Sequence, residues 1–187
     1  MEADHLTYLL IDGENLDATL GGSILGRRPH PEERPRWERV VDFLGARWHT
    51  EVRPLFFMNA SNGTLPMPFV QALMAMGYRP IPLSGGYGVK VVDEGILRML
   101  EAIEGRAGDV VLGSHDGDFA AHIERLIDAG RRVGLAGFHE CISTSYRDLV
   151  PRGLELFDLE RDMGCFNKPL PRLRVIPLDE FDPNEFL

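Results

Sequence analysis

Short apolar runs alternate with amphipathic segments along most of this sequence, and this alternation limits the folds that the chain can adopt. The runs typical of strands are 6–11, 52–58, 78–83, 110–113 and 131–137. The segments with helical spacing of apolar residues are 37–48, 65–76, 96–103 and 119–129. Strands that alternate with helices form a parallel sheet with helices on both faces. We therefore predict an α/β fold, a three-layer α/β/α sandwich around a mainly parallel sheet, and we place the proline-containing run 78–83 at its edge.

An acidic loop follows the run 110–113, where the expected strand gives way to a helix. It contains Asp116 and Asp118 after Ser114 and His115. In an open α/β sheet, ligands bind beyond the carboxyl ends of the strands, so two carboxylates in this place suit metal chemistry. They also suit a structural role, because Asp116 can cap the helix and Asp118 can favour its positive end. From this loop alone, both interpretations stay open.

A second acid stands at the end of the first expected strand. The run 6–11 is followed by Asp12, Gly13, Glu14 and Asn15. Gly13 lets the backbone turn sharply, and the Asn15 amide can orient the Asp12 carboxylate or hold a water molecule. A β-turn uses the same residue types. Turn chemistry alone does not explain why they follow a buried strand directly.

A third acid comes from a glycine-rich segment at 84–93. It delivers Lys90 and then Asp93 to the start of a helix. Lys90 can hold a phosphate or balance clustered carboxylates. The glycines match neither a dinucleotide-binding loop nor a Walker loop, so an ordinary loop with an aspartate at a helix N-terminus is the alternative.

Three separate segments thus bring acids to one sheet edge: Asp12, Asp93, and Asp116 with Asp118. Carboxylates that share a cleft repel one another, and a cation or bound protons must relieve this repulsion. Oxygen ligands suit Mg²⁺ or Mn²⁺. Such ions activate water and stabilise the leaving oxygen in phosphodiester cleavage. His115 lies inside the acidic loop, and we assign it a role in specificity at most.

The segment 21–36 is expected as a long polar loop. It carries four arginines, at positions 27, 28, 34 and 36, and loops of this length are often lids or binding segments. These arginines can meet phosphates near Asp12. The alternative is a solvated loop whose charge Glu32 and Glu33 partly offset.

Composition limits the class of protein. The 187 residues, 44% of them hydrophobic, suit one domain with a substantial core. The sequence lacks an apolar run near the roughly 20 residues that span a membrane, and Met1–His5 is polar, unlike a signal peptide. Two cysteines make no disulfide framework, so we expect a cytoplasmic protein. The formal net charge of −9 argues against tight binding to a long duplex.

The last part of the sequence changes in character. We divide the chain into a domain at 1–163, with 154–159 as a last strand or a packing segment, and a proline-rich acidic tail at 164–187. The tail is expected to wrap on the surface or to reach a second subunit. Its apolar residues Phe181 and Phe186 favour a homodimer contact.

Three blocks of this sequence resemble the signature blocks of NYN domains, the LabA-like relatives of PIN-domain nucleases. They read Ile-Asp-Gly-Glu-Asn-Leu at 11–16, Lys-Val-Val-Asp at 90–93 and Ser-His-Asp-Gly-Asp-Phe at 114–119. They occur in the family's order, and the resemblance spans about residues 6–160. It implies a PIN-like α/β/α sandwich with an acidic Mg²⁺ or Mn²⁺ site that cleaves RNA.

The resemblance also implies roles for individual residues. Asp12, Asp93, Asp116 and Asp118 would be the catalytic, metal-binding acids. The residues expected to contribute to substrate binding are Asn15, Lys90, Ser114 and His115.

The sequence departs from the family pattern in three places, and these departures keep other functions open. One is a late family segment that often carries another Asp, which residues 149–157 match only loosely. The third block usually reads Ser-Gly-Asp-Ser-Asp-Phe, and Met99 stands near the place of an acid often found after the Asp93 position. The alternative is therefore a catalytically weak or inactive module that binds RNA or a protein partner. A phosphatase that uses Asp12 as nucleophile ranks last, because Glu14 stands where that pattern has a second Asp.

Overall fold

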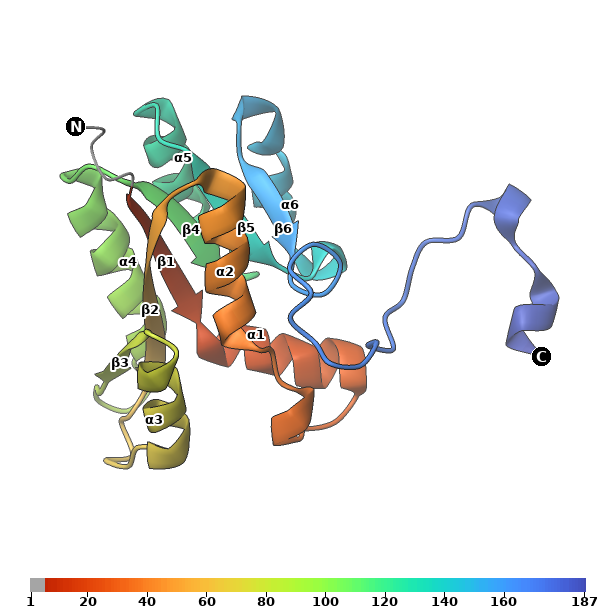
Figure 1. Cartoon of the computed structure of the whole chain (residues 1–187), viewed down its shortest axis with the longest axis horizontal. Coiled ribbons are helices and arrows are strands. Elements are labelled where there is room, and N and C mark those ends of the chain that lie inside the picture. The colour runs from red at the N-terminus through yellow and green to blue at the C-terminus, as the bar shows by residue number, and fades with distance from the viewer. Residues whose placement is uncertain (1–5) are drawn as a thin grey trace.

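Six parallel strands form one sheet at the centre of the computed structural model, which describes residues 6–187 (Figure 1). The strands are β1 (Leu6–Asp12), β2 (Glu51–Asn59), β3 (Arg79–Leu83), β4 (Asp109–Gly113), β5 (Val133–Gly137) and β6 (Glu155–Asp158). Their order in the sheet is β3-β2-β1-β4-β5-β6, and every neighbouring pair is parallel. The predicted edge position of the strand with two prolines is confirmed, since β3 is the outermost strand. The prediction that residues 1–5 do not form a signal peptide concerns residues outside the described range.

Helices cover both faces of this sheet, so the predicted three-layer sandwich is confirmed. The helices are α1 (Gly13–Thr19), α2 (Trp37–Trp48), α3 (Met67–Ala75), α4 (Val91–Glu104), α5 (Ala120–Asp128) and α6 (Thr144–Arg147). One hydrophobic cluster joins the sheet to α1, α2 and α3, and a second joins it to α4, α5 and α6. Within residues 6–187, every helix is too short or too polar to cross a lipid bilayer.

The two central strands are apolar because both of their faces are covered. On β1, Tyr8 and Leu10 pack into the cluster with α4 and α5, while Leu9 and Ile11 pack into the cluster with α1 and α2. Such continuous apolar runs are typical of buried parallel strands. The one polar side chain at the carboxyl end of β1, Asp12, therefore needs a special environment.

The chain runs from β1 outward through β2 to β3, and then returns to the other side of β1 to form β4, β5 and β6. The order of strands thus reverses between β1 and β4. In doubly wound sheets, ligands bind at this point, beyond the carboxyl ends of the strands. The topology therefore places the start of α1, after Asp12, and the loop after Gly113 at the position where a binding site is expected.

The segment 21–36 is more regular than the predicted polar loop. The chain continues from α1 into a π-helical turn, Leu20–Leu25, and a 3-10 turn follows at Pro31–Glu33. Leu16 and Leu20 are four residues apart and both are buried. This shared apolar face explains why the helical structure continues.

Two arginines of this segment form ion pairs with acids. Arg27 Nη2 lies 2.6 Å from Glu33 Oε1, and Arg34 Nε lies 2.7 Å from Asp17 Oδ1. Neither arginine lines the cavity described below. That these arginines meet phosphates stays a prediction.

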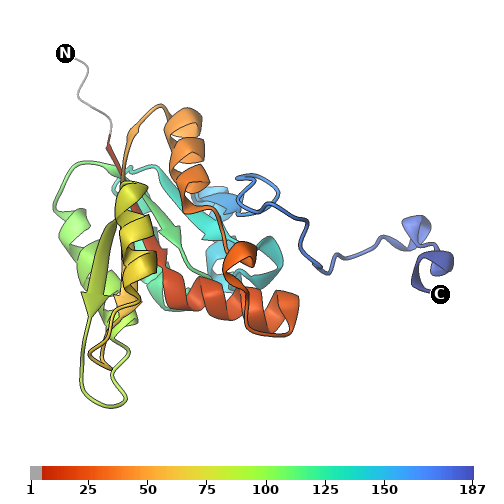
Figure 2. The same ribbon diagram turned by 60° about the horizontal axis from the view of Figure 1, so that its bottom comes forward.

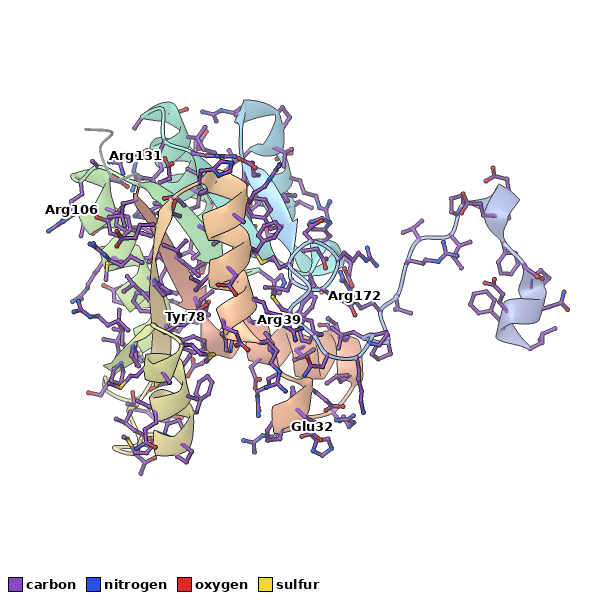
Figure 3. The ribbon with its side chains drawn as sticks, in the orientation of Figure 1. Glu32, Arg39, Tyr78, Arg106, Arg131 and Arg172 are labelled. Carbon is purple, nitrogen blue, oxygen red and sulfur yellow. The ribbon has the colours of Figure 1, made fainter. Side chains whose placement is uncertain are left out.

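The segment predicted as a tail, 164–187, divides into two parts. The first part packs against the body, where Arg39 of α2 donates hydrogen bonds to the Gly164 carbonyl oxygen at 2.9 Å and to Asn167 Oδ1 at 2.8 Å. Figure 3 labels Arg39 on α2 and Arg172 near the point where the segment leaves the body. The residues after Arg172 lead away from the body in both ribbon views (Figures 1 and 2).

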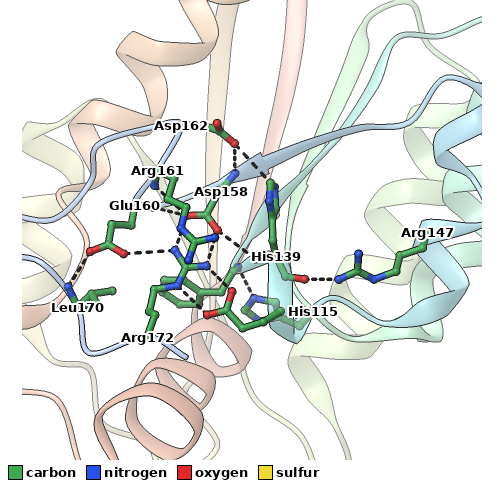
Figure 4. Close-up of polar contacts among 11 residues, drawn as sticks. His115, His139, Arg147, Asp158, Glu160, Arg161, Asp162, Leu170 and Arg172 are labelled. Carbon is green, nitrogen blue, oxygen red and sulfur yellow. Dashed lines mark hydrogen bonds and ion pairs between the residues drawn. The ribbon is translucent and has the colours of Figure 1, made fainter. Parts of the chain in front are cut away.

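Arg172 fixes the first part of the tail by inserting its guanidinium among acids beside β6 (Figure 4). Nη1 and Nη2 each lie 2.6 Å from an oxygen of Asp158, and further ion pairs join Arg172 to Glu140 and Glu160. The guanidinium also stacks over the Phe138 ring, 5.2 Å from its centroid. Asp158 is fully buried, and the Arg172 side chain is only 3% exposed.

The ionised state of Asp158 depends on these donors. Burial alone would raise the pKa of Asp158, but hydrogen bonds from Arg172 and from the backbone N–H groups of Arg161 and His139 lower it to about 2. A buried carboxylate of this kind is stable only while its partners are present. The tail therefore supplies a group that the folded body requires.

Replacing Arg172 should destabilise the whole domain. Arg172→Ala leaves the Asp158 charge buried without its main partner, which typically costs about 3 kcal/mol or more of unfolding free energy. Urea unfolding measured by circular dichroism checks this expectation. Arg174→Ala is the control, since Arg174 is exposed and its ion pair with the exposed Glu180 is long, at 3.9 Å. Equal midpoints for the two variants would contradict the anchoring role.

Candidate active site

A cavity of about 400 Å³ lies at the carboxyl edge of the sheet, at the reversal of strand order. It is formed by the end of β1 and the first turn of α1, the end of β2, the loop before α4 with the first turn of α4, and the loop after β4. Its polar lining residues are Asp12, Glu14, Asn15, Asn59, Lys90, Asp93 and Asp116. Acids that are far apart in sequence thus share one cavity.

Asp12 is the most buried of these acids. It ends β1 and caps α1, where its Oδ1 accepts a hydrogen bond from the Asn15 backbone N–H at 3.2 Å. Its Oδ2 accepts a hydrogen bond from Ser114 Oγ at 2.9 Å. Gly13 allows this arrangement, because a Cβ there would lie 2.4 Å from Phe56 Cε1. A helix cap and a site carboxylate are therefore the same residue.

The environment of Asp12 disfavours its charged form. Burial raises the pKa of Asp12 to about 6, although the hydrogen bonds from Ser114 and Asn15 act in the opposite direction. The negative charges of Asp93 and Asp116 raise this pKa as well. A cation in the cavity would reverse this balance by favouring ionised carboxylates.

Ser114 links the two central strands rather than facing the cavity. The residue is fully buried, and its Oγ both donates to Asp12 and accepts the Asp116 backbone N–H at 3.2 Å. Asp116 in turn accepts the Asp118 backbone N–H at 3.0 Å, which caps a 3-10 turn. Both interpretations of Asp116 therefore hold, since it caps a turn and also lines the cavity.

His115 is buried, and both of its ring nitrogens face protein groups. Nε2 accepts the Phe138 backbone N–H at 2.7 Å, so Nδ1 carries the proton and donates to Asn15 Oδ1 at 3.2 Å. The same Asn15 oxygen accepts the His115 backbone N–H at 2.8 Å. Burial lowers the pKa of His115 to about 4. This geometry makes His115 a neutral positioning residue, and its contact with substrate stays a prediction.

Asp93 and Lys90 approach the cavity from the first turn of α4. Asp93 is half-buried, and its Oδ2 lies 3.8 Å from Lys90 Nζ. Burial raises the pKa of Asp93, the charge of Asp116 adds to this effect, and Lys90 opposes it. Lys90 is mostly exposed, with 77% of its side chain accessible. The ammonium group is therefore free to approach an anionic ligand at the rim.

Asp118 is the predicted metal ligand that the structure does not bring into the lining. It is exposed and lies in the 3-10 turn that Asp116 caps. Its charge contributes to the raised pKa of Asp93, so it is near the site without forming its wall. Direct binding of a metal by Asp118 stays a prediction.

Two polar lining residues were not assigned to the site from the sequence. Glu14 is exposed in the first turn of α1, and Asn59 ends β2 beside β1. Asn59 could have been predicted from the sequence, because it ends a strand next to β1, and the carboxyl ends of parallel neighbours lie on the same edge of the sheet. Glu14 stands inside the first acidic block, where spacing does not show which carboxylate points inward.

The donor chemistry of the cavity fits a hard divalent cation. Asp12, Asp93 and Asp116 offer carboxylate oxygens, which Mg²⁺ and Mn²⁺ prefer. Within the described range 6–187, however, His, Cys, Asp and Glu side chains form no group of three or more arranged to hold a metal ion. Mg²⁺ usually keeps several waters and is held by one or two carboxylates. The residues therefore fit a hydrated ion better than one enclosed by protein ligands.

Comparisons with known proteins support the fold and leave the function open. The chain matches no protein-family model, and a search of curated proteins also gives no match. It is similar to the crystal structure of a protein of unknown function from Vibrio parahaemolyticus RIMD 2210633, with a TM-score of 0.64 and 21% sequence identity. The similarity covers 87% of this chain and 98% of that protein.

Asp12→Asn should stabilise the protein at neutral pH. The pKa of Asp12 is about 6 in the folded protein against an ordinary value of 3.8. As the pH rises through this window, the unfolded chain releases its proton first, so the wild type loses up to about 3 kcal/mol of stability that the variant keeps. Urea unfolding at pH 4 and pH 7.5 in EDTA measures this difference.

The control for this measurement is Asp42→Asn, at an exposed position of α2 outside the cavity lining. This variant also removes one carboxylate, so it shows the effect of losing a negative charge outside the cavity. A stability difference between Asp12→Asn and wild type that is equal at both pH values would show that the Asp12 carboxyl has no raised pKa.

Proposed function

We propose that this protein is a metal-dependent ribonuclease of the NYN and PIN type, which cleaves RNA phosphodiester bonds with Mg²⁺ or Mn²⁺. The observation that carries the proposal is the convergence of Asp12, Asp93 and Asp116 on one cavity, at the reversal of strand order. Each of the three acids comes from a different block of the family resemblance. Burial and the charges of neighbouring acids raise the pKa of Asp12 and the pKa of Asp93. Metal-binding carboxylates without their ion are expected to show such a shift.

Each part of the site has a role in this proposal. Asp12, Asp93 and Asp116 would hold a hydrated ion, directly or through its water molecules, and that ion would supply an activated water and stabilise charge on the phosphate. Lys90 contacts a phosphate oxygen at the rim and offsets the acids beside it. Asn15 Oδ1 is engaged by His115, so its amide N–H groups are what it can offer to a ligand.

A second candidate function is a module of the same fold that binds RNA or a protein without cleavage. It is favoured by Met99, which packs against the hydrophobic core where the family often has another acid. Glu94 and Glu101 do not compensate, because they pair with Arg98 and His122 outside the cavity. A site with fewer acids would bind its ion less tightly, and turnover would suffer most.

Cleavage of RNA should depend on Asp116. Asp116→Asn keeps the cap oxygen but removes the charge, so we expect a loss of about 100-fold or more in rate, as several kcal/mol of charge stabilisation disappears. The substrates are labelled single-stranded and hairpin RNAs with Mg²⁺ or Mn²⁺, and an EDTA reaction shows the metal requirement. Asp42→Asn again serves as the control and should cleave at the wild-type rate.

Each outcome of this assay selects one function. Cleavage that needs metal and is lost in Asp116→Asn supports the nuclease. Cleavage that is equal in wild type and Asp116→Asn removes the site assignment. A folded wild type that binds RNA without cutting it favours the binding module.

We also propose that the end of the tail forms a contact between two copies of the chain. Beyond Arg172 the tail carries exposed apolar side chains among acids, and Phe181 and Phe186 pack against each other with 5.6 Å between ring centroids. Leu178 and Leu187 are almost fully exposed. Apolar side chains grouped in this way are typical of interaction segments.

Both cysteines are free thiols, which is usual in a reducing compartment and supports the proposed cytoplasmic location.

Removing residues 175–187 should lower the mass of the protein in solution from that of a dimer to that of a monomer. This truncation keeps Arg172 and its ion pairs, so the body should remain folded, and thermal unfolding of the same sample verifies it. Light scattering coupled to size exclusion measures the mass. If the full chain and the truncated chain have the same number of subunits, the tail is not a subunit contact.

A further inference from the structure

The loop between β3 and α4, residues 84–90, is held firmly at its base. The Leu83 carbonyl oxygen accepts the Ala60 backbone N–H at 2.7 Å, and Ser61 Oγ accepts the Gly85 backbone N–H at 3.1 Å. Gly85 is required there, because a Cβ would lie 2.5 Å from Val91 Cγ1. In Figure 2 this loop extends beyond the end of the sheet, below β3 and α4.

The tip of this loop is a tight turn that presents one aromatic side chain. The Gly86 carbonyl oxygen accepts the Val89 backbone N–H at 3.2 Å, and Gly88 has a φ of +77°. Glycine with positive φ at the third position of a turn is the pattern of a type II turn. Tyr87 occupies the second position, and its side chain is fully exposed. A glycine on each side leaves both faces of the ring open.

The same loop forms part of the cavity wall. Val89 and Lys90 line the cavity together with the acids Asp12, Asp93 and Asp116. Along the sequence, Tyr87 is therefore two residues from Val89 in the cavity wall and three residues from Lys90 at the rim. A strand whose phosphate lies at Lys90 and that continues along this loop reaches Tyr87, the exposed aromatic side chain at the tip of the loop. Exposed aromatic side chains beside a phosphate-binding cation are the elements from which single-stranded nucleic acid sites are built.

We propose that Tyr87 is a stacking platform for an unpaired base of the RNA strand whose phosphate enters the cavity, and that the substrate is therefore single-stranded. The inference rests on the proposed function, because the strand must reach the cavity for its base to meet the ring. Bases in a duplex already stack on each other and do not offer a face to a side chain. The net charge of −9 agrees with this choice, since a long duplex needs more basic contacts.

Binding of short RNAs tests the proposal without relying on cleavage. The probes are labelled oligoadenylate of ten nucleotides, the same strand with abasic sites, and a hairpin of equal length, measured by anisotropy with Ca²⁺ as the divalent ion. Tyr87→Ala should weaken binding of oligoadenylate about tenfold, as expected for the loss of one stacked base. Tyr87→Phe should bind within about twofold of wild type, because a stacking ring needs no hydroxyl.

The abasic strand supplies the second comparison. Wild type and Tyr87→Ala should bind it equally, since the base that stacks is absent. Met74→Ala is the control, as it removes an exposed apolar side chain from α3 outside the cavity lining, and it should bind like wild type. In Tyr87→Trp, the new indole should be quenched by the single strand and not by the hairpin. Trp37 and Trp48 are both buried and should not respond.

The outcomes separate this inference from the proposed function. If Tyr87→Ala binds oligoadenylate as tightly as wild type, the stacking role is wrong, while the metal-dependent nuclease still stands. An equal loss in Tyr87→Phe and Tyr87→Ala also overturns stacking, because it points to the hydroxyl. Preference for the hairpin overturns the single-stranded substrate. A wild type that binds none of the probes overturns both the inference and the proposed function.

Discussion

The site depends on one buried carboxylate, Asp12, held at the place where the order of strands reverses. Its two oxygens accept hydrogen bonds from Ser114 Oγ and the Asn15 backbone N–H, so its position ties β1 to the loop after β4. Burial and two neighbouring acids oppose its ionisation. A carboxylate in this state binds a proton or a cation more readily than an exposed one, because both relieve the same repulsion.

His115 makes one side of the site rigid. It connects Asn15, after β1, with the Phe138 backbone, after β5, through the two nitrogens of a neutral ring. With a pKa near 4, the ring stays neutral at physiological pH, and its hydrogen bonds do not change with small pH shifts. The opposite side, around Lys90, is a glycine-rich loop with an exposed tip. His115 thus fixes the acids after β1 and β4, while the loop before Lys90 is hydrogen-bonded to the body at Leu83 and Gly85 and ends in a turn of its own.

Much of the fold follows from the sequence because it depends on local patterns. The alternation of apolar runs and amphipathic segments gives the strands, the helices and the parallel sheet, and the prolines in β3 give its edge position. The meeting of Asp12, Asp93 and Asp116 also follows, since carboxyl ends of parallel strands share one edge. What the sequence does not show are contacts between distant segments that have no periodic pattern. Arg172 reads as one more charge in an acidic tail, yet it is buried against Asp158.

The same limit applies within the acidic loop. Asp116 and Asp118 are two aspartates in one short loop, and the sequence alone does not show which of them lines the cavity. The 3-10 turn at Gly117–Phe119 separates them, because Phe119 must enter the core and the turn rotates Asp118 outward. Likewise Ser114 and His115 are predicted to contact substrate, and the structure adds that their buried side chains form hydrogen bonds with Asp12 and Asn15. Which polar side chain faces a ligand is decided by the packing of its apolar neighbours.

Cleavage of RNA and binding of RNA without cleavage share one physical requirement at this site. The lining of the cavity is acidic, with Lys90 as its cationic member, so an RNA phosphate that enters it meets repulsion from Asp12, Asp93 and Asp116. A divalent cation removes this repulsion by binding both the carboxylates and the phosphate, whether or not the bond is then cut. Binding of RNA at this site should therefore depend on the cation even in a protein without turnover. Acidic residues over the surface weaken the attraction for a long duplex. The acids in the cavity, by contrast, bind the cation that bridges to a phosphate, so a short single strand is preferred.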